Sequence, residues 1–349
     1  MKITKELFSK SNHDVFLFNL KNDNGIEIKI SNYGGIITSW LVPDKNGSKI
    51  DIVLGFNTFE EYRNPHYLKS CPYLGAIIGR YANRIGKGSF SIDGNEHNVV
   101  INNGENHLHG GIEGFDKKIW NAEIFENESD ICLSLSYLSA DGEENYPGNL
   151  HVKVNYTLNN KNELSVKYFA KTDKTTTLNL TQHSYFNLKG EGKGDILDHI
   201  ICINADKYTK PDANLIPTGE MPDLLQNTLD LRTEKAIKEN IKKVGGNGYD
   251  HNYILNKKEG ELSFAAKVAE PESNRILEVY TTKPGIQFYT GNFLDSSLTG
   301  KSGNAYFAHA GFCLETQFFP DSPNKPEFPS SFLKAGEIYE HETIFKISL

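Results

Sequence analysis

The sequence predicts an all-β fold, a large and mostly antiparallel β-sandwich with a few short helices. Apolar residues alternate with polar ones in many short runs, which is typical of strands that are buried on one face. The 17 Tyr and 20 Phe suit the pleated, half-buried surface of a sheet, and 30 Gly supply its turns. Helical periodicity is scarce, so sheets are expected to carry most of the core.

The size of the chain bounds its domain organisation. Large all-β folds often reach 349 residues as one unit, and the sequence contains no internal repeat and no linker-like stretch. We therefore expect a single domain, residues 1–349. The sequence does not predict an oligomeric state.

Charge and cysteine usage narrow the partners and the compartment. The net charge is −8 and no run is rich in Lys or Arg, which argues against nucleic acid and membrane as partners. The N-terminus is charged and leads into no long apolar run, so neither a secretory signal nor a membrane span is expected. The four cysteines are scattered without a Cys-x-x-Cys pair. They predict reduced thiols and a cytoplasmic location.

Several strands follow from alternation. Residues 26–30 and 131–137 each place apolar side chains on one face. The clearest hairpin pairs residues 150–158 with 164–168, and the polar residues 159–162 form the turn between them.

Two short helices are expected. Thr58 and Glu61 form a capping box that begins the first. The second is predicted over residues 233–243, with Ile237 and Ile241 on one face and two glycines beyond its end.

A carboxylate lies inside the apolar run 311–317. In a strand, Phe312 and Leu314 point to one face, while Cys313 and Glu315 point to the other. Burial would raise the pKa of Glu315 and make it a useful general base near neutral pH. The alternative is a structural Glu neutralised by a buried Lys or Arg.

Two further segments carry polar groups suited to a ligand. Asn83 and Arg84 offer a planar set of donors for vicinal hydroxyls or a carboxylate, although a surface Arg is the commoner case. Asp250 follows a glycine-rich stop and would either cap a turn or accept hydrogen bonds from a ligand.

His107 and His109 stand two apart. On a strand they would share a face, and Glu113 completes a His-x-His-x-x-x-Glu pattern like that of cupin metal sites. Against a metal site, the glycines at 110–111 should break the strand at once, and Trp120 stands where a cupin needs a glycine.

His183 stands among polar residues that are flanked by apolar ones. This arrangement is typical of a strand end at the rim of a site. Imidazole has the side-chain pKa that best suits proton donation near neutral pH. A structural histidine with satisfied hydrogen bonds is the alternative.

Together these segments form an ordered series. The motifs are Asn83-Arg84, residues 108–111, 141–148, 183–188, 249–252, 287–292, 314–317 and 323–326. The series resembles the aldose 1-epimerase (galactose mutarotase) family, from about residue 32 to the C-terminus.

The resemblance implies a β-sandwich of the galactose mutarotase type and a cofactor-free interconversion of the α and β anomers of free aldoses such as glucose and galactose. It implies that Glu315 is the general base, that His183 is the general acid and that His109 assists at the ring oxygen or the anomeric oxygen. His107 falls outside the pattern. The residues expected to hold the sugar are Asn83, Arg84, Tyr185, Asp250 and Gln287.

The residue types suit this reaction. Opening a pyranose removes the proton of the anomeric hydroxyl while another group protonates the ring oxygen, which a carboxylate and an imidazolium do together. Neither a metal nor a nicotinamide is required. The alternatives are a hexose-phosphate epimerase, a non-catalytic sugar-binding domain and a cupin-like metalloenzyme. The preferred aldose does not follow from the sequence.

Overall fold

The structure is a computed structural model that describes residues 1–10, 14–44 and 46–348. Within these residues, sheets of nine, five and four strands make up most of the fold. The nine-stranded sheet has the spatial order β11 (Asn121–Glu126), β12 (Asp130–Ser139), β13 (Leu150–Asn159), β14 (Glu163–Thr172), β28 (Tyr339–Ser348), β22 (Ile276–Thr281), β21 (Ser263–Ala269), β17 (Ile200–Ile203) and β19 (Lys235–Ala236).

The other sheets are smaller. The five-stranded sheet contains β1 (Lys2–Lys10), β2 (Asp14–Lys21), β3 (Glu27–Ser31), β4 (Ile37–Pro43) and β5 (Lys49–Asp51) in that order. The four-stranded sheet contains β18 (Ala205–Tyr208), β20 (Asp250–Leu255), β23 (Gly285–Tyr289) and β26 (Cys313–Gln317). Two-stranded pairs join β6 (Ile77–Ile78) to β16 (Thr181–Gln182), β7 (Arg84–Ile85) to β10 (His107–Leu108), β8 (Ser89–Ile92) to β9 (Asn95–Asn98), β15 (Thr176–Thr177) to β27 (Phe332–Leu333), and β24 (Asp295–Thr299) to β25 (Ala305–Phe307).

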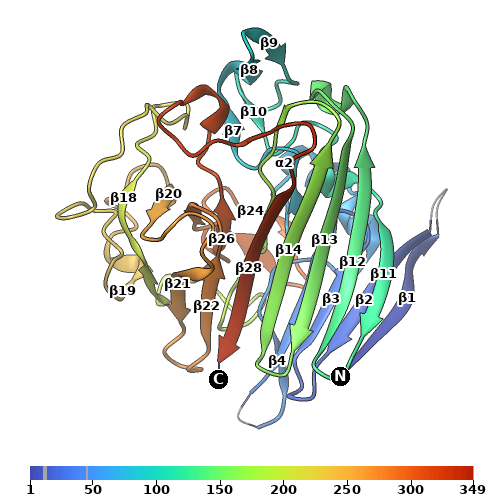
Figure 1. Cartoon of the computed structure of the whole chain (residues 1–349). Coiled ribbons are helices and arrows are strands. Elements are labelled where there is room, and N and C mark those ends of the chain that lie inside the picture. The colour runs from blue at the N-terminus through green and yellow to red at the C-terminus, as the bar shows by residue number, and fades with distance from the viewer. Residues whose placement is uncertain (11–13, 45, 349) are drawn as a thin grey trace.

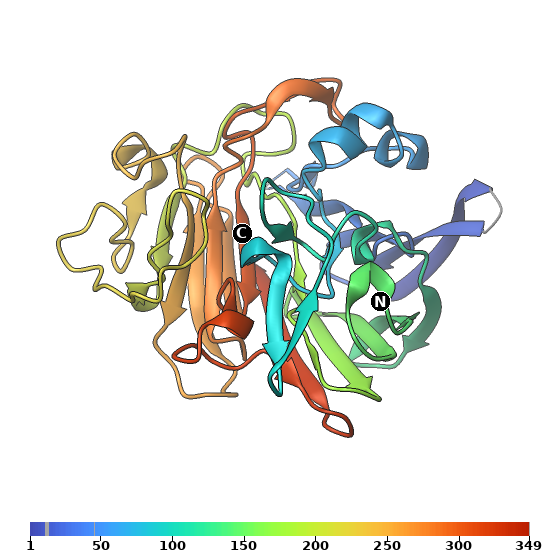
Figure 2. The same ribbon diagram turned by 90° about the horizontal axis from the view of Figure 1, so that it is seen from above.

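The arrangement confirms the predicted all-β sandwich. Figure 1 shows the long strands β11 to β14 and β28 side by side, with the N-terminal strands beside them. Figure 1 and Figure 2 agree that β1 lies at one end of the molecule and that β18 and β19 lie at the other.

The predicted hairpin is confirmed as β13 and β14. The two strands are antiparallel, with Leu150 opposite Thr172 and Leu158 opposite Leu164. Even-numbered residues of β13 face the core, while His151 and Lys153 are exposed. Alternation therefore fixes which face of this sheet is buried, because a slip of one residue would expose the whole apolar set.

One hydrophobic cluster contains side chains from all three large sheets. Trp40 of β4 lies in it, with its ring centroid 5.9 Å from that of Phe186 and 6.5 Å from that of Phe345 on β28. Burying each such ring stabilises the fold by roughly 1.5–3 kcal/mol. This core holds the strands that present the site described below.

Helices are few and short. They are α1 (Phe59–Tyr62), α2 (Pro65–Ser70) and the 3-10 turns η1 (Gly86–Gly88), η2 (Phe115–Lys117), η3 (Glu143–Asn145), η4 (Ile237–Glu239) and η5 (Ser322–Asn324). The predicted start of α1 is confirmed, since the Glu61 carboxylate accepts hydrogen bonds from the Thr58 N–H at 2.9 Å and hydroxyl at 2.8 Å. No helix of the described residues is long and apolar enough to cross a membrane.

The helix predicted over residues 233–243 is wrong. The segment forms the edge strand β19 and then η4. Ile237 and Ile241 are buried as predicted, but the N–H groups of Ile237 and Lys238 donate to the carbonyls of His199 and Leu197 at 2.9 Å each. Pairing with the neighbouring segment replaces the hydrogen bonds that a helix would make within itself.

Candidate active site

Glu315 occupies the centre of β26 and faces a cavity. As the alternation predicted, Phe312 and Leu314 belong to the hydrophobic core, and Glu315 faces away from it. Glu315 is only 3% exposed, and its Oε2 atom has no hydrogen-bond partner among the described residues. Burial raises the pKa of this carboxyl group well above its usual value, the charge of Asp250 adds to the rise, and that of Arg84 opposes it.

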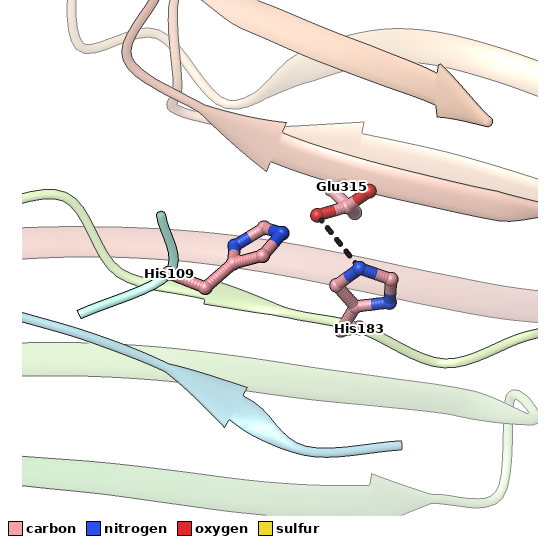
Figure 3. Close-up of side chains that lie close together, drawn as sticks. All are labelled: His109, His183 and Glu315. Carbon is pink, nitrogen blue, oxygen red and sulfur yellow. Dashed lines mark ion pairs between the residues drawn. The ribbon is translucent and has the colours of Figure 1, made fainter. Parts of the chain in front are cut away.

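The structural alternative for Glu315 fails. Within the described chain, no Lys or Arg forms an ion pair with Glu315. The titratable side chain that lies next to it is His183. The His183 Nε2 atom lies 3.5 Å from Glu315 Oε2. Figure 3 shows the imidazoles of His183 and His109 turned toward the carboxyl group of Glu315. A carboxyl group and an imidazole from distant parts of the chain therefore meet across one short gap.

His183 follows directly after β16 and is 4% exposed. Its imidazole stacks on the Tyr185 ring at a centroid distance of 5.2 Å, and its Nδ1 atom lies 3.6 Å from Cys313 Sγ. Burial lowers the pKa of His183 to about 4. The sequence pattern placed His183 at the rim of a site, and the structure places its ring in the cavity lining, buried among aromatic groups.

His109 lies beyond the end of β10, with a backbone φ of 52°. Its Nδ1 atom accepts a hydrogen bond from the Asn83 backbone N–H at 3.2 Å. Burial and the nearby imidazole of His183 hold the pKa of His109 well below its usual value. The ring is therefore neutral, and because Nδ1 is an acceptor the proton must reside on Nε2.

Cross-strand register brings Asp250 and Gln287 to Glu315. Gln287 on β23 stands directly opposite Glu315 on β26. On the far side of β23, Asp250 of β20 accepts a hydrogen bond from Gln287 Nε2 at 2.6 Å. Gln317 Nε2 donates to Gln287 Oε1 at 3.2 Å and so fixes the orientation of this amide. Three strands thus present a row of polar groups on one face of the four-stranded sheet.

The remaining predicted residues also reach the site. Arg84 Nε donates to Asn103 Oδ1 at 3.2 Å. Asn83 has a φ of 66°, and its side-chain oxygen accepts from the Arg84 backbone N–H at 2.8 Å, which holds the turn between the two. Tyr185 supports His183 by stacking.

A cavity of about 460 Å³ contains all eight predicted residues in its lining. They are Asn83, Arg84, His109, His183, Tyr185, Asp250, Gln287 and Glu315. Such a volume falls in the range of small-molecule sites. A concave site with a buried carboxyl group, two neutral imidazoles and a row of amide and carboxylate groups suits proton transfer on a polar small molecule.

Comparisons with known proteins identify the family. Residues 17–346 match the family described as aldose 1-epimerase. The chain belongs to the aldose 1-epimerase family. It is 48% identical to a galactose mutarotase of Bos taurus over 332 residues, which cover 95% of this chain and 94% of that protein. It is 36% identical to an aldose 1-epimerase of Escherichia coli (strain K12) over 338 residues, with coverage of 95% and 94%.

Solved structures agree with this epimerase in fold. A GalM/aldose epimerase homologue from C. elegans has a TM-score of 0.86 at 29% identity and covers 95% of this chain and 98% of its own. A galactose 1-epimerase from Lactobacillus acidophilus NCFM has a TM-score of 0.86 at 27% identity, with coverage of 99% and 98%. The galactose mutarotase type of sandwich is therefore confirmed, and the chain is an isomerase with aldose 1-epimerase activity.

His107 of the epimerase does not share a face with His109. Val100 O lies 2.6 Å from its Nδ1 atom, and the Tyr146 hydroxyl lies 2.6 Å from its Nε2 atom. The left-handed backbone of His109 ends the strand, as the following glycines predicted, so the two side chains diverge. Among the described residues, His107, His109 and Glu113 do not gather into a group suited to a metal.

A different trio has the spacing of a metal site. Atoms of His109, His183 and Glu315 lie within 4.8 Å of one another. A metal-binding imidazole nitrogen needs a free lone pair, however, and His109 Nε2 carries the proton because Nδ1 accepts from Asn83. The donor set therefore does not fit a metal through His109, and it fits hydrogen-bond donation to a substrate oxygen.

Several residues of the cavity were not predicted from the sequence. Asn103, Tyr289 and Phe293 line it, as does Tyr73. Tyr289 could have been predicted from the sequence, because it lies two residues after Gln287 and so shares its face of the strand. Tyr73 could not have been predicted in this way, because it lies in a loop, where its φ is 58°.

Proposed function

We propose that this epimerase interconverts the α and β anomers of free aldoses such as galactose and glucose, with Glu315 and His183 as the acid–base pair. The observation that carries the proposal is the approach of His183 Nε2 to Glu315 Oε2 at 3.5 Å inside the cavity. The similar mammalian proteins are named galactose mutarotases, which supports a hexose as the substrate.

In the proposed ring opening, Glu315 takes the proton of the anomeric hydroxyl. The bond between C1 and the ring oxygen breaks, its electron pair goes to the ring oxygen, and His183 delivers a proton there. Rotation about C1–C2 presents the other face of the aldehyde, and the reverse proton transfers close the ring as the other anomer. Only protons move, so the reaction needs no cofactor.

His109 has a separate role in the proposal. Its Nε2–H would donate a hydrogen bond to the ring oxygen or the anomeric oxygen, where charge develops in the transition state. The Asn83 N–H supports this role because it holds the proton on Nε2. A neutral imidazole can donate this hydrogen bond without giving up its proton.

Arg84, Asp250 and Gln287 would hold the sugar hydroxyls, with Asn83 and Tyr185 beside them. Asp250 offers acceptors and Arg84 offers donors, so vicinal hydroxyls can be read from both sides. The existing hydrogen bond between Gln287 and Asp250 supports this assignment, because it fixes both groups before the sugar arrives.

The charge of the cavity favours unphosphorylated sugars. Among its described lining residues, Arg84 is the only Arg or Lys, and it is outnumbered by the carboxylates of Asp250 and Asp295. Arg80 is no help to a phosphate, since it is buried elsewhere and donates to Ser139 Oγ and to backbone carbonyls. A phosphate dianion would therefore meet net negative charge.

A monosaccharide is the proposed partner, with neither nucleic acid nor membrane involved. The proposed location is the cytoplasm. All four cysteines are free, which suits a reducing compartment.

Substituting Glu315→Gln tests the assignment. The amide cannot accept the anomeric proton. In the presence of the variant, the optical rotation of freshly dissolved α-D-galactose and α-D-glucose is therefore expected to change at the uncatalysed rate. Glu340→Gln, on the exposed face of β28, is the control and should keep the wild-type rate. A folded Glu315→Gln variant with near wild-type activity would refute the proposed base.

A further inference from the structure

Tyr73 contacts both imidazoles of the site. Its ring centroid lies 4.6 Å from that of His109 in an edge arrangement, and 5.9 Å from that of His183 in a stacked arrangement with an interplanar angle of 30°. The residue follows the end of α2, and its side chain is 8% exposed at the wall of the cavity. One aromatic ring thus limits the movement of two groups that the reaction needs in register.

The stacking on His183 has an electrostatic consequence. The face of an aromatic ring attracts a cation, so a tyrosine stacked on imidazole favours the protonated ring over the neutral one. Tyr185 also stacks on His183, at 5.2 Å and 22°. These contacts oppose desolvation, which disfavours imidazolium in so buried a place.

Burial keeps the proton on the Tyr73 hydroxyl. Burial raises the pKa of the Tyr73 phenol well above its usual value, and the charges of Cys71 and Asp116 add to the rise. The ammonium group of Lys117 lies 5.5 Å from the centroid of the Tyr73 ring. Its charge is balanced by the Asp116 carboxylate, which lies 2.6 Å away. The aromatic ring is the part of Tyr73 that packs against both histidines.

We propose that Tyr73 is a positioning residue that holds His109 and His183 in their reactive orientation and favours the protonated form of His183. The inference rests on the proposed function, because it assigns Tyr73 a role in the same proton transfers. Five titratable side chains face His183. They are Glu315, Cys313, His109 and the tyrosines Tyr73 and Tyr185.

Three variants test the inference. Tyr73→Leu removes the aromatic face, and its kcat for galactose anomerisation is expected to fall by roughly ten- to a hundredfold while KM changes by less than about threefold. Tyr73→Phe keeps the ring and should restore most of the lost kcat. Tyr67→Leu is the matched control, because Tyr67 lies in the same hydrophobic cluster and its ring packs against Phe56 and Tyr62.

A second measurement does not depend on activity. Imidazole resonances of His183, followed by NMR during acid titration, should show protonation at a lower pH in Tyr73→Leu than in the wild type and Tyr73→Phe. If the wild type does not anomerise sugars, the proposed function fails, and this titration still tests the contact with His183. Should Tyr73→Leu not fold, Tyr73→Met fills the volume without an aromatic face and replaces it.

Three results would overturn the inference. An unchanged kcat in Tyr73→Leu would show that the ring does not position the histidines. A rise in KM with kcat preserved would make Tyr73 a sugar contact instead. A loss in Tyr73→Phe as large as that in Tyr73→Leu would assign the role to the hydroxyl.

Discussion

At the scale of residues, the proposed mechanism depends on which of Glu315 and His183 carries a proton. Burial raises the pKa of Glu315 and lowers that of His183, so in the empty cavity the proton is expected to lie on the carboxyl group. The proposed ring opening needs it on the imidazole. A bound sugar would favour the state with the proton on His183, because its hydroxyls would donate hydrogen bonds to the Glu315 carboxylate. The positive charge of Arg84 also favours the ionised form of Glu315.

Substituting His183→Asn removes the proposed proton donor. The variant cannot protonate the ring oxygen, and its kcat is expected to fall at least about a hundredfold. Polarimetry with galactose measures the loss. His151→Asn, on the exposed face of β13, is the control for removing a histidine. A decrease of less than about tenfold would leave His183 with a binding role only.

Individual site residues differed in how well the sequence could predict them. Alternation alone placed Glu315 on the face opposite Phe312 and Leu314, because strand geometry has a period of two. The pKa of His183 could not be predicted, since it depends on the aromatic rings packed around it. Tyr73 was out of reach for the same reason: a contact between a loop and two histidines has no pattern in the sequence.

At the scale of elements, left-handed turns aim the side chains of the site. Asn83 and His109 adopt φ values of 66° and 52°, and Gly110 follows at 87°. A Cβ atom on Gly110 would lie 1.8 Å from the carbonyl oxygen of Gly79. Glycine is therefore needed at this position both for its φ and for the close approach of a second backbone segment.

Substituting Gly110→Ala is expected to destabilise the protein and displace His109. The matched control is Gly94→Ala, because Gly94 has a φ of 81° but open space around its Cβ position. The control should cost only about 1–2 kcal/mol of unfolding free energy from backbone strain. Gly110→Ala should cost more and also lower kcat, as checked by chemical denaturation and polarimetry. Equal effects of the two substitutions would contradict the backbone contact.

Elements were predictable where hydrogen bonding was local. The hairpin of β13 and β14 and the cap of α1 depend on residues close in sequence. The helix over residues 233–243 failed because the apolar spacing of Ile237 and Ile241 fits both a helix and an edge segment. The segment became an edge strand and a 3-10 turn because its N–H groups bond to the carbonyls of Leu197 and His199, which are distant in the sequence.

At the scale of the whole molecule, one apolar cluster joins the sheets that carry the site. The sandwich could be predicted from alternation and turn residues. The order of nine strands could not, because β28 from the C-terminus lies between β14 and β22. That the chain forms a single domain stays a prediction.

Buried neutral histidines should make the fold sensitive to mild acid. Burial lowers the pKa of His107 and that of His199 to about 4 from 6.5. The Tyr146 hydroxyl contacts His107 Nε2, and the Leu188 N–H donates to His199 Nε2 at 3.0 Å, so protonation breaks or reverses these contacts. The unfolded chain binds protons from about pH 6.5 downward while the folded chain does not, so stability is complete above that pH and is lost toward pH 4.

The free energy of unfolding is therefore expected to fall by about 2 kcal/mol per histidine between pH 7 and pH 5, or about 4 kcal/mol for this pair. Urea denaturation at the two pH values measures the loss. His107→Gln should reduce the loss between pH 7 and pH 5 by about 2 kcal/mol, whatever the stability of the variant at pH 7. The exposed His151→Gln should leave it unchanged. A loss between pH 7 and pH 5 that is as large in His107→Gln as in the wild type would show that His107 is not held neutral by the fold.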